Sequence, residues 1–232
     1  MNQKNSDLCA VKSVARTLVY IDPKICDLGF VQHPFLQFSF VPAPDYALSH
    51  RILHVDDQQD LIEIRSAILD QIERTTSYLH LLFLIQKPYS GAFFKMSQMY
   101  LSDQDFATAL EYIWTNVECP NVAPNVSQSD WIRFFKKAKP ELLMDRDEIE
   151  MLDQLPDRVV VYRGLQPNAS VQGLSWTIDS NIAKWFASRF GHNGSVYRAE
   201  IEKCNILAFF GNRGEKEVVV DPKNLIGVEA FS

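Results

Sequence analysis

The fold class is decided by RVVVYRGL at residues 158–165, with GLSWT at residues 173–177 and EKEVVVD at residues 215–221 after it. These stretches are β-branched or alternating and are bounded by Gly, Pro or Asn, which is the pattern of short strands. Strands are predicted at residues 158–163, 195–201, 205–210, 217–221 and 227–230. One helix is predicted from Ser180 to Phe190, where apolar residues recur every three or four positions.

A change in composition marks the start of this region at Pro156. Seven of the nine glycines follow residue 156, so tight turns are frequent there. The net charge is −6 overall, with a balance of −7 over residues 1–155 and +1 over residues 156–232. We therefore predict that residues 156–232 form a β-rich core that differs in architecture from the chain before it.

The residues before this core carry helical patterns. An apolar face at three-to-four spacing runs from Asp60 to about Ile85, and a second helix is predicted from Ser102 to Val117 with Ser102 as its N-cap. Two more are predicted at residues 129–135 and 141–155, the last with its acidic residues facing water. Residues 56–155 are therefore expected to form a helical lobe.

The first 55 residues give a weaker pattern. Their apolar stretches are interrupted by Pro23, Pro34, Pro42 and Pro44, which disfavours both helices and central strands. We interpret residues 1–55 as an extended or irregular N-terminal extension, and residues 56–232 as one domain.

Length and composition exclude several classes of protein. The chain has 232 residues, of which 47% are hydrophobic and 22% charged, as expected of a globular fold. Its longest apolar run, Tyr78 to Ile85, is far shorter than the roughly 20 residues that cross a bilayer. Its basic cluster between Arg133 and Lys139 is too short for a phosphate-binding stripe. We expect neither a membrane nor nucleic acid as a partner.

The N-terminus and the cysteines bear on location and metal content. No basic segment followed by an apolar core is present, so a Sec signal peptide is not predicted. The expected location is the cytoplasm, or a host cell reached through a specialised export system. The four cysteines form no CxxC pair and the histidines add no ligand set, so neither a metal nor a disulfide framework is expected.

Two carboxylates stand close together in the late strand region. On a strand, Glu215 and Glu217 would lie on one face, about 6.5 to 7 Å apart along the backbone, because successive side chains alternate. A carboxylate stabilises the positive charge that develops when a glycosidic bond breaks. Glu217 is our candidate for this role, although an exposed edge strand with solubilising charges is the common alternative for such a motif.

An arginine followed by a glycine stands at the end of the first predicted strand. The planar guanidinium of Arg163 is suited to a bidentate grip on pyrophosphate, and Gly164 would let the backbone approach a ligand closely. The alternative is that Arg163 is paired with a carboxylate of the helical lobe. Ser175 and Thr177 likewise have an ordinary alternative, the capping of the helix that follows them.

The order and spacing of three motifs resemble the ADP-ribosyltransferases of the Arg-Ser-Glu type. The motifs are Val161-Tyr162-Arg163-Gly164, Ser175-Trp176-Thr177 and Glu215-Lys216-Glu217. The resemblance covers residues 158–222. It implies an α+β fold in which a helical N-terminal lobe packs on a mostly antiparallel two-sheet core that binds NAD.

The resemblance also implies how NAD would be held. Arg163 would fix the dinucleotide, and the backbone at Gly164 would bond the nicotinamide amide. Glu217 would bind the 2′-hydroxyl of the nicotinamide ribose. Ser175 would hydrogen-bond Glu217 and fix its rotamer, and Thr177 is the second hydroxyl of that motif.

A second group of residues would serve the nicotinamide ring and the acceptor. Phe186 is a candidate to stack on the nicotinamide. Glu215 would face the acceptor, and the turn containing Asn212, Arg213 and Gly214 would help to choose the target. Because a guanidinium with a pKa above about 12 must be oriented and deprotonated to react, glutamate at position 215 favours arginine as the target.

These implications predict a mono-ADP-ribosyltransferase that moves ADP-ribose from NAD to an arginine of a target protein and releases nicotinamide. No metal is expected. No GxGxxG or Walker motif is present, so NAD would not bind through a Rossmann turn. Two alternatives remain open: an NAD glycohydrolase, and a catalytically inactive NAD-binding or protein-interaction module. Bacterial toxins, translocated effectors and phage proteins all occur among proteins of this type.

Overall fold

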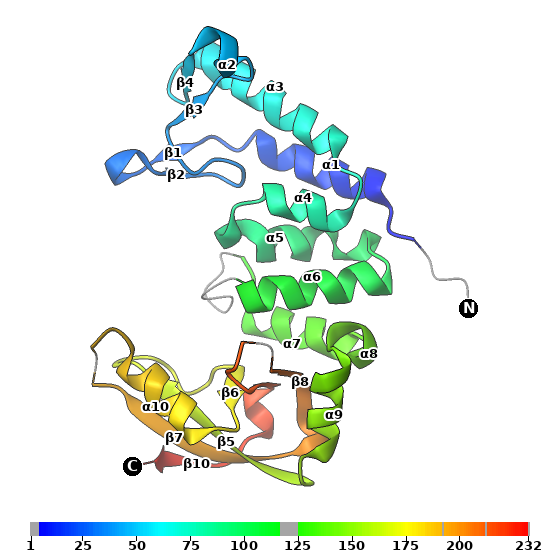
Figure 1. Ribbon diagram of the computed structural model, residues 1–232, viewed down its shortest axis with the longest axis vertical. Coiled ribbons are helices and arrows are strands. Elements are labelled where there is room, and N and C mark those ends of the chain that lie inside the picture. Colours follow the sequence, from blue (N-terminus) through cyan, green and yellow to red (C-terminus); the bar gives the residue numbers. More distant parts are fainter. Residues whose placement is uncertain (1–4, 117–124, 192, 212, 232) are drawn as a thin grey trace. The chain divides into compact units, whose positions relative to one another are not determined.

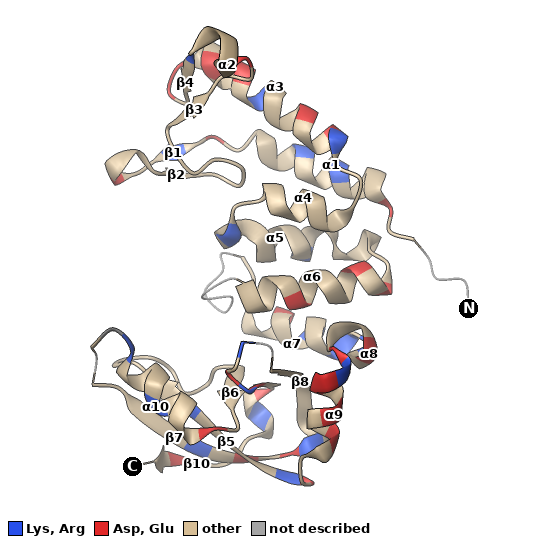
Figure 2. Ribbon diagram, viewed as in Figure 1, with Lys and Arg blue, Asp and Glu red and all other residues tan. Residues whose placement is uncertain are grey.

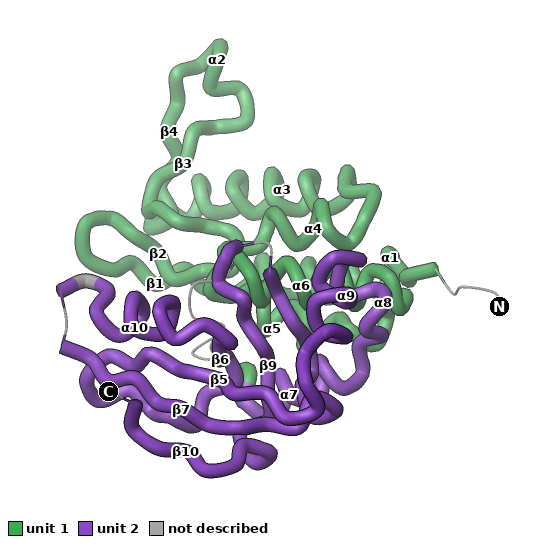
Figure 3. The backbone as a smooth tube through the Cα atoms, turned by 60° about the horizontal axis from the view of Figure 1, so that its bottom comes forward, with its two compact units in different colours: residues 1–126 green, residues 127–232 purple. Residues whose placement is uncertain are grey.

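The computed structural model describes residues 5–116, 125–191, 193–211 and 213–231. The chain forms two compact units, unit 1 at residues 1–126 and unit 2 at residues 127–232 (Figure 3). The sequence predicted boundaries at residues 55 and 155 instead. The division lies at residue 126 because helices just before the strands pack on the sheet of unit 2, as described below.

Unit 1 consists mainly of helices (Figure 1). They are α1 (Leu8–Val19), α2 (Tyr46–Ser49), α3 (Gln58–Arg74), α4 (Tyr78–Leu84), α5 (Lys87–Ser97) and α6 (Asp103–Asn116). The predicted helix from Asp60 to Ile85 is therefore divided in two. Thr75 and Ser77 have extended backbone angles, and the Ser77 side chain caps α4 by accepting the His80 N–H at 3.2 Å.

The prediction of an extended or irregular segment over residues 1–55 is wrong for its first part. Leu8–Val19 is a helix whose N-terminus is capped by Asp7, which accepts the Ala10 N–H at 3.0 Å. Val11, Ala15 and Val19 recur every four residues and are fully buried, which stabilises the helix. The prolines begin only after it.

The remainder of this segment is mainly extended or irregular, as predicted, apart from the short helix α2. Strand β1 (Lys24–Ile25) pairs with β2 (Val31–Gln32), and β3 (Phe40–Pro42) pairs with β4 (Ile52–His54). Both pairs are antiparallel and two-stranded. They extend from the helices of unit 1 as two separate hairpins (Figure 1).

Unit 2 begins with α7 (Gln128–Lys137), α8 (Pro140–Leu143) and α9 (Arg146–Gln154). Helices α7 and α9 both contact strand β8 (Ile206–Phe210). The rings of Phe135 and Phe210 lie 6.3 Å apart, and the Phe209 N–H approaches the Met144 sulfur at 3.1 Å. These contacts bury the apolar faces of the helices against the strand, which is why residues 127–155 belong to the same unit as the sheet.

The predicted helix over residues 141–155 is interrupted at Met144, which has extended backbone angles. Asp145 then starts α9 with a capping box: its side chain accepts the Glu148 N–H at 2.8 Å, and Glu148 accepts the Asp145 N–H at 3.1 Å. Glu148 is buried, so the expectation that the acidic residues of this helix all face water is wrong at this position.

The centre of unit 2 is a six-stranded sheet with the order β10-β7-β5-β6-β9-β8. Its remaining strands are β5 (Arg158–Leu165), β6 (Ser175–Thr177), β7 (Ser195–Glu202), β9 (Glu217–Val220) and β10 (Ile226–Phe231). All neighbouring strands are antiparallel. This confirms a mixed α+β structure with an antiparallel sheet and strands close to their predicted positions.

The expected two-sheet core is instead one sheet made of two three-stranded halves, β10-β7-β5 and β6-β9-β8. Among the described residues the halves are joined by a single register pair, Tyr162 on β5 and Thr177 on β6. Strand β6 pairs with β9 over all three of its residues, so it belongs more closely to the β6-β9-β8 half.

Helix α10 (Ser180–Ser188) covers the middle of this sheet, in contact with β5, β6 and β7. Gly164 permits the close approach, because an added Cβ would lie only 1.9 Å from the Ala183 carbonyl oxygen. Ala183 and Ala187 of α10 form a buried cluster with Val196 of β7.

Charged residues of both signs lie on strands β5, β7 and β10 (Figure 2). Arg198 on β7 pairs with Glu229 on β10 at 3.2 Å and with Glu200 on its own strand at 3.3 Å. Arg158 on β5 pairs with Glu200 at 3.7 Å. These side chains are mostly half-exposed, so each pair contributes little to stability.

Candidate functional site

The sheet register brings the three sequence motifs together. Tyr162 on β5 lies opposite Thr177 on β6, Thr177 lies opposite Glu217 on β9, and Glu217 lies opposite Phe210 on β8. Directly opposed residues on antiparallel strands share a face of the sheet. Thr177 and Glu217 are therefore side by side, with the first motif on the adjacent strand.

Arg163 lies at the junction of the two halves of the sheet. Its Nη1 donates a hydrogen bond to the carbonyl oxygen of Ser175. Its Nε is buried and has no hydrogen-bond partner in the described part of the chain. Burial lowers the pKa of Arg163 to about 10, and the charge of Glu217 opposes this shift. The arginine and the glutamate, 54 positions apart in the sequence, are thus near enough to interact.

Gly173 makes room for this guanidinium. A Cβ at position 173 would lie 2.1 Å from Nη2 and 2.3 Å from Cζ of Arg163. The sequence analysis did not single out Gly173 as a site residue. Its position two residues before the Ser175-Trp176-Thr177 motif was the available signal, because a glycine beside a motif residue marks a close approach.

Glu217 is the first residue of β9 and is only 9% exposed. A buried carboxylate is costly unless it is paired or hydrogen-bonded, so its position in the middle of a sheet is more typical of a site than of a solubilising charge. The alternative of an exposed edge strand is therefore wrong for Glu217, since β9 lies between β6 and β8.

The sequence predicted that Glu215 and Glu217 lie on one face of the same strand. This prediction is wrong for Glu215. Strand β9 begins at Glu217, and Lys216 has a φ of 45°, so side-chain alternation does not hold across this residue. Two contacts fix the bend. The Lys216 Nζ lies 3.0 Å from Asp179 Oδ2, and the Thr177 Oγ1 donates to the Glu215 carbonyl oxygen at 2.8 Å.

The side chain of Glu215 instead lines an open pocket of about 420 Å³. The other lining residues come from α10 and from the turn before Glu215: Asn181, Ile182, Trp185, Arg213 and Gly214. The two glutamates are therefore placed in different surroundings, Glu217 in the sheet and Glu215 in the pocket.

The Ser175-Trp176-Thr177 motif makes hydrogen bonds through the backbone of Ser175 and the side chain of Thr177. Ser175 accepts from Arg163 through its carbonyl oxygen and lies opposite Val219 on β9. The predicted hydrogen bond from its hydroxyl to Glu217 stays a prediction. Thr177 also serves the helix that follows, because its Oγ1 accepts the Asp179 N–H at 3.1 Å. The alternative that this motif serves the start of the following helix therefore holds for Thr177, which also lies beside Glu217.

Phe186 lies on α10 beside Trp185, with ring centroids 4.9 Å apart and an interplanar angle of 73°. It is partly buried, whereas Trp185 is 54% exposed and lines the pocket. The stacking of Phe186 on a nicotinamide stays a prediction. The sequence analysis singled out Phe186 rather than Trp185, and the exposure of Trp185 depends on the tertiary fold.

The predicted recognition turn is tight. The Gly214 N–H donates to the Gly211 carbonyl oxygen at 2.9 Å, and Gly214 has a φ of 71°, which glycine adopts without strain. Arg213 is half-exposed and its Nη2 lies 3.4 Å from Glu215 Oε1. Asn212, the remaining predicted turn residue, lies outside the described residues.

Glu148 on α9 is a supporting residue that the sequence analysis missed. Its Oε1 accepts the Gly211 N–H at 2.9 Å, while its Oε2 caps its own helix. It thus fixes the start of the turn that carries Arg213 and Glu215. The Asp-x-x-Glu capping box was visible in the sequence, but its link to Gly211 depends on the tertiary fold.

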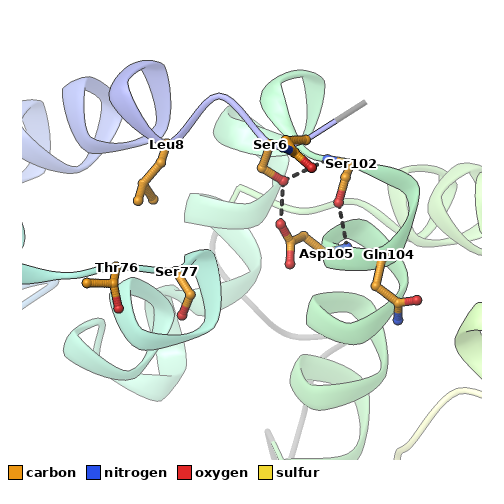
Figure 4. A pocket seen from close by; sticks show the side chains of 8 residues that line it. Ser6, Leu8, Thr76, Ser77, Ser102, Gln104 and Asp105 are labelled. Carbon is orange, nitrogen blue, oxygen red and sulfur yellow. Dashed lines mark hydrogen bonds between the residues drawn. The ribbon is translucent and has the colours of Figure 1, made fainter. Parts of the chain in front are cut away.

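Unit 1 has a separate polar pocket of about 390 Å³ (Figure 4). Figure 4 shows Ser6, Ser102 and Asp105 joined by hydrogen bonds, and the Ser102 N–H donates to Ser6 Oγ at 2.7 Å. The Ser102 hydroxyl accepts the Asp105 N–H at 3.0 Å, which confirms the predicted N-cap of α6. These groups satisfy each other, so we interpret this pocket as part of the framework of unit 1.

Comparisons of the chain with models of protein families, with curated proteins and with solved structures found no match. Across the described ranges, no helix is long and apolar enough to cross a membrane. The same residues contain no group of three His, Cys, Asp or Glu side chains placed to hold a metal ion.

Proposed function

We propose that unit 2 is a mono-ADP-ribosyltransferase that transfers ADP-ribose from NAD to an arginine of a target protein and releases nicotinamide. One observation carries the proposal: residues of the three motifs, Arg163, Thr177 and Glu217, lie on the consecutive strands β5, β6 and β9 at the middle of the sheet. A constellation assembled from distant segments in this way is typical of a site built for chemistry.

NAD fits the groups that this site offers. The Arg163 guanidinium has a buried Nε–H with no partner in the described ranges, and it lies in a cradle left open by Gly173. A pyrophosphate would supply the acceptors and the negative charge that this guanidinium needs. A bound anion would also raise the pKa of Arg163 again, since a nearby negative charge favours the protonated form.

Glu217 would serve the reacting ribose. As the bond from C1′ to the nicotinamide nitrogen breaks, its electron pair leaves with nicotinamide and positive charge develops on the ribose. A buried carboxylate stabilises this charge more strongly than an exposed one, because water does not screen it. Thr177 lies directly opposite Glu217, and its hydroxyl donates to the Glu215 carbonyl oxygen. This hydrogen bond holds the backbone at Glu215.

The test is the substitution Glu217→Gln, measured as nicotinamide release from NAD and as label transfer to protein. Loss of one preorganised charge predicts a fall in both rates of at least about 100-fold. Glu202→Gln is the matched control, since Glu202 is exposed at the end of β7. If Glu217→Gln turns over NAD as fast as the control, the proposal fails.

NAD glycohydrolysis is the second candidate function, and the different locations of the two glutamates favour it. Glu217 lies in the sheet whereas Glu215 lies in a separate pocket. Cleavage of NAD and positioning of an acceptor are thus assigned to different places, so water can replace the acceptor without any change at Glu217. The two activities are separated by the Glu215 experiment in the Discussion.

A further inference from the structure

The two hairpins of unit 1 carry a row of three aromatic rings. Phe30 follows the turn between β1 and β2, and Phe38 and Phe40 lie two residues apart, just before and at the start of β3. Phe30 and Phe38 are directly opposed in the backbone pairing, so the three side chains share one face. The centroid of the Phe38 ring lies 5.3 Å from that of Phe30 and 6.0 Å from that of Phe40.

This face of the hairpins is open to water. The three rings are between 40% and 49% exposed, whereas Val31 and Leu53, on the same hairpins, are buried. An antiparallel pair with one buried face normally carries polar side chains on the other face. A contiguous apolar surface in that place is typical of an interaction site.

Leu28 extends this surface at the tip of the β1–β2 hairpin. Leu28 and Gly29 have φ angles of 60° and 76°, a pair of left-handed residues for which hairpin turns favour Asn, Asp or Gly. Leucine is unfavourable there because its Cβ crowds the backbone, and Leu28 is 92% exposed, so packing does not offset this cost. A Cβ at Gly29 would lie 4.0 Å from the Phe40 ring, which places the turn beside the row.

We call Leu28, Phe30, Phe38 and Phe40 the hairpin patch, and the charge of unit 1 limits what it can bind. Unit 1 holds nine Lys and Arg against fourteen Asp and Glu, a balance of −5. Residues 22–57, which contain both hairpins, hold five Asp against two Lys and Arg, a balance of −3. A second copy of the chain or an anionic lipid surface would meet like charge, whereas a cationic partner would be attracted.

The aromatic rings favour a cationic partner for a second reason. The side chain of Arg or Lys stacks on an aromatic face, where its apolar stem covers the ring and its charge is attracted by the π electrons. Unit 1 already contains such a contact, because the Arg65 guanidinium lies over the Tyr20 ring at 5.8 Å. Charge and ring chemistry therefore point to the same kind of partner.

We propose that the hairpin patch binds a protein segment in which apolar side chains stand next to Arg or Lys. The apolar side chains would cover Leu28 and the edges of the rings, and the cations would stack on the rings within the acidic surroundings. This partner site lies in unit 1 and does not depend on the function proposed for unit 2.

The first experiment measures fluorescence anisotropy of three labelled synthetic peptides with the purified full chain. The peptides are repeats of Gly-Arg-Leu, of Gly-Glu-Leu and of Gly-Arg-Ser. The Gly-Arg-Leu peptide should bind at least about tenfold more tightly than the other two, because one lacks the cations and the other lacks the apolar side chains.

The second experiment uses Leu28→Asn, which separates binding from folding. Asparagine tolerates the left-handed conformation, so the variant should have a higher Tm than wild type. Its affinity for the Gly-Arg-Leu peptide should fall at least about tenfold, since the apolar tip is lost. The matched control is Leu48→Asn, at an 88% exposed position on α2 at the tip of the β3–β4 hairpin, which should bind the peptide as wild type does (Figure 1).

Several results would overturn this proposal. Equal binding of the Gly-Arg-Leu and Gly-Glu-Leu peptides, or binding of neither, removes the cationic partner. Unchanged affinity in Leu28→Asn removes the hairpin patch as the site, and a lower Tm in this variant shows that Leu28 serves the fold. Binding to vesicles of phosphatidylcholine and phosphatidylserine that Leu28→Asn abolishes would assign the patch to lipid. A dimer in sedimentation that Leu28→Asn dissociates would assign it to a second copy.

Discussion

Arg163 carries a cost in stability that anion binding would offset under the proposed function. Taking a guanidinium out of water is unfavourable unless acceptors replace the lost hydration, and its buried Nε finds none among the described residues. The lowered pKa expresses the same cost, since burial disfavours the charged form. A purely structural arginine would have its N–H groups satisfied within the fold.

The first residue-scale prediction follows from this cost. Arg163→Met keeps most of the side-chain volume but leaves the buried Glu217 carboxylate without the charge of Arg163, so the free energy of unfolding without NAD should fall. Under the proposed function NAD should raise the Tm of wild type, and this increase should disappear in the variant because the pyrophosphate loses its partner. Thermal unfolding with and without NAD measures both quantities.

A purely structural role for Arg163 predicts a different response to NAD. Its hydrogen bond to the Ser175 carbonyl oxygen would then be its main contribution, and Arg163→Met would lower Tm by the same amount with and without NAD. An NAD-induced shift that persists in a folded Arg163→Met variant would remove pyrophosphate binding from this residue.

At the scale of elements, the capping box of α9 joins a helix to the recognition turn. Glu148→Ala removes the acceptor for the Gly211 N–H and for the Asp145 N–H at once. Leaving such groups without partners should lower the free energy of unfolding by about 1 to 3 kcal/mol. Chemical denaturation monitored by circular dichroism measures the change.

The control for this prediction is Glu150→Ala on the same helix. Glu150 is exposed and its contact is a hydrogen bond from Gln154 at 3.3 Å, so its loss should change stability by less than about 0.5 kcal/mol. Equal effects of the two substitutions would show that Glu148 contributes only helix propensity and does not support the turn.

Elements with a clear local signal could be predicted from the sequence. Helix α6 has an N-capping serine and a periodic apolar face, and α10 has the same combination with Asp179 as its cap. The break between α3 and α4 contains neither Gly nor Pro, so the pattern continued through it. Helix α1 was missed because the prolines that follow it dominated the interpretation of residues 1–55.

The candidate site could also be predicted only where a local sequence signal existed. The sequence could name Arg163 and Glu217, since charged residues at the ends of apolar strands are conspicuous. It could not place Glu215, because the positive φ of Lys216 arises from tertiary contacts, among them the ion pair with Asp179. Strand order is likewise set by long-range pairing, such as that of Thr177 with Glu217, which has no local signature.

At the scale of the whole molecule, two buried groups of unit 1 confine its stability to a window of pH. Burial raises the pKa of Tyr78 well above its ordinary value of 10.0, and burial lowers the pKa of His33 below 6.5. His33 stabilises the folded state above pH 6.5 and loses this contribution as the pH falls. Tyr78 stabilises it below pH 10 and loses this contribution as the pH rises.

The alkaline limit can be tested with Tyr78→Phe. The ring and its stacking on Phe93 remain, while the hydroxyl contact with Ser97 at 2.9 Å is lost, so the variant should be about 1 kcal/mol less stable at pH 8. Above pH 10 the difference should shrink, because the unfolded variant has no phenol to ionise at this position. Urea unfolding at pH 8 and pH 10.5 measures it, and an unchanged difference would exclude Tyr78 as the titrating group.

The two glutamates allow the two halves of the proposed reaction to be separated in one molecule. Glu215→Gln leaves the buried carboxylate of Glu217 in place but removes the charge that orients and deprotonates an acceptor guanidinium in the pocket. Transfer to arginine should therefore fall by at least about 100-fold while slow NAD hydrolysis persists, because water needs no such base once the ribosyl cation forms. Nicotinamide release and label incorporation must be measured separately on the same preparation. If Glu215→Gln transfers to arginine as well as wild type, arginine is the wrong acceptor. If neither Glu215→Gln nor Glu217→Gln changes NAD turnover, the site is not catalytic, and unit 2 is better explained as a binding module.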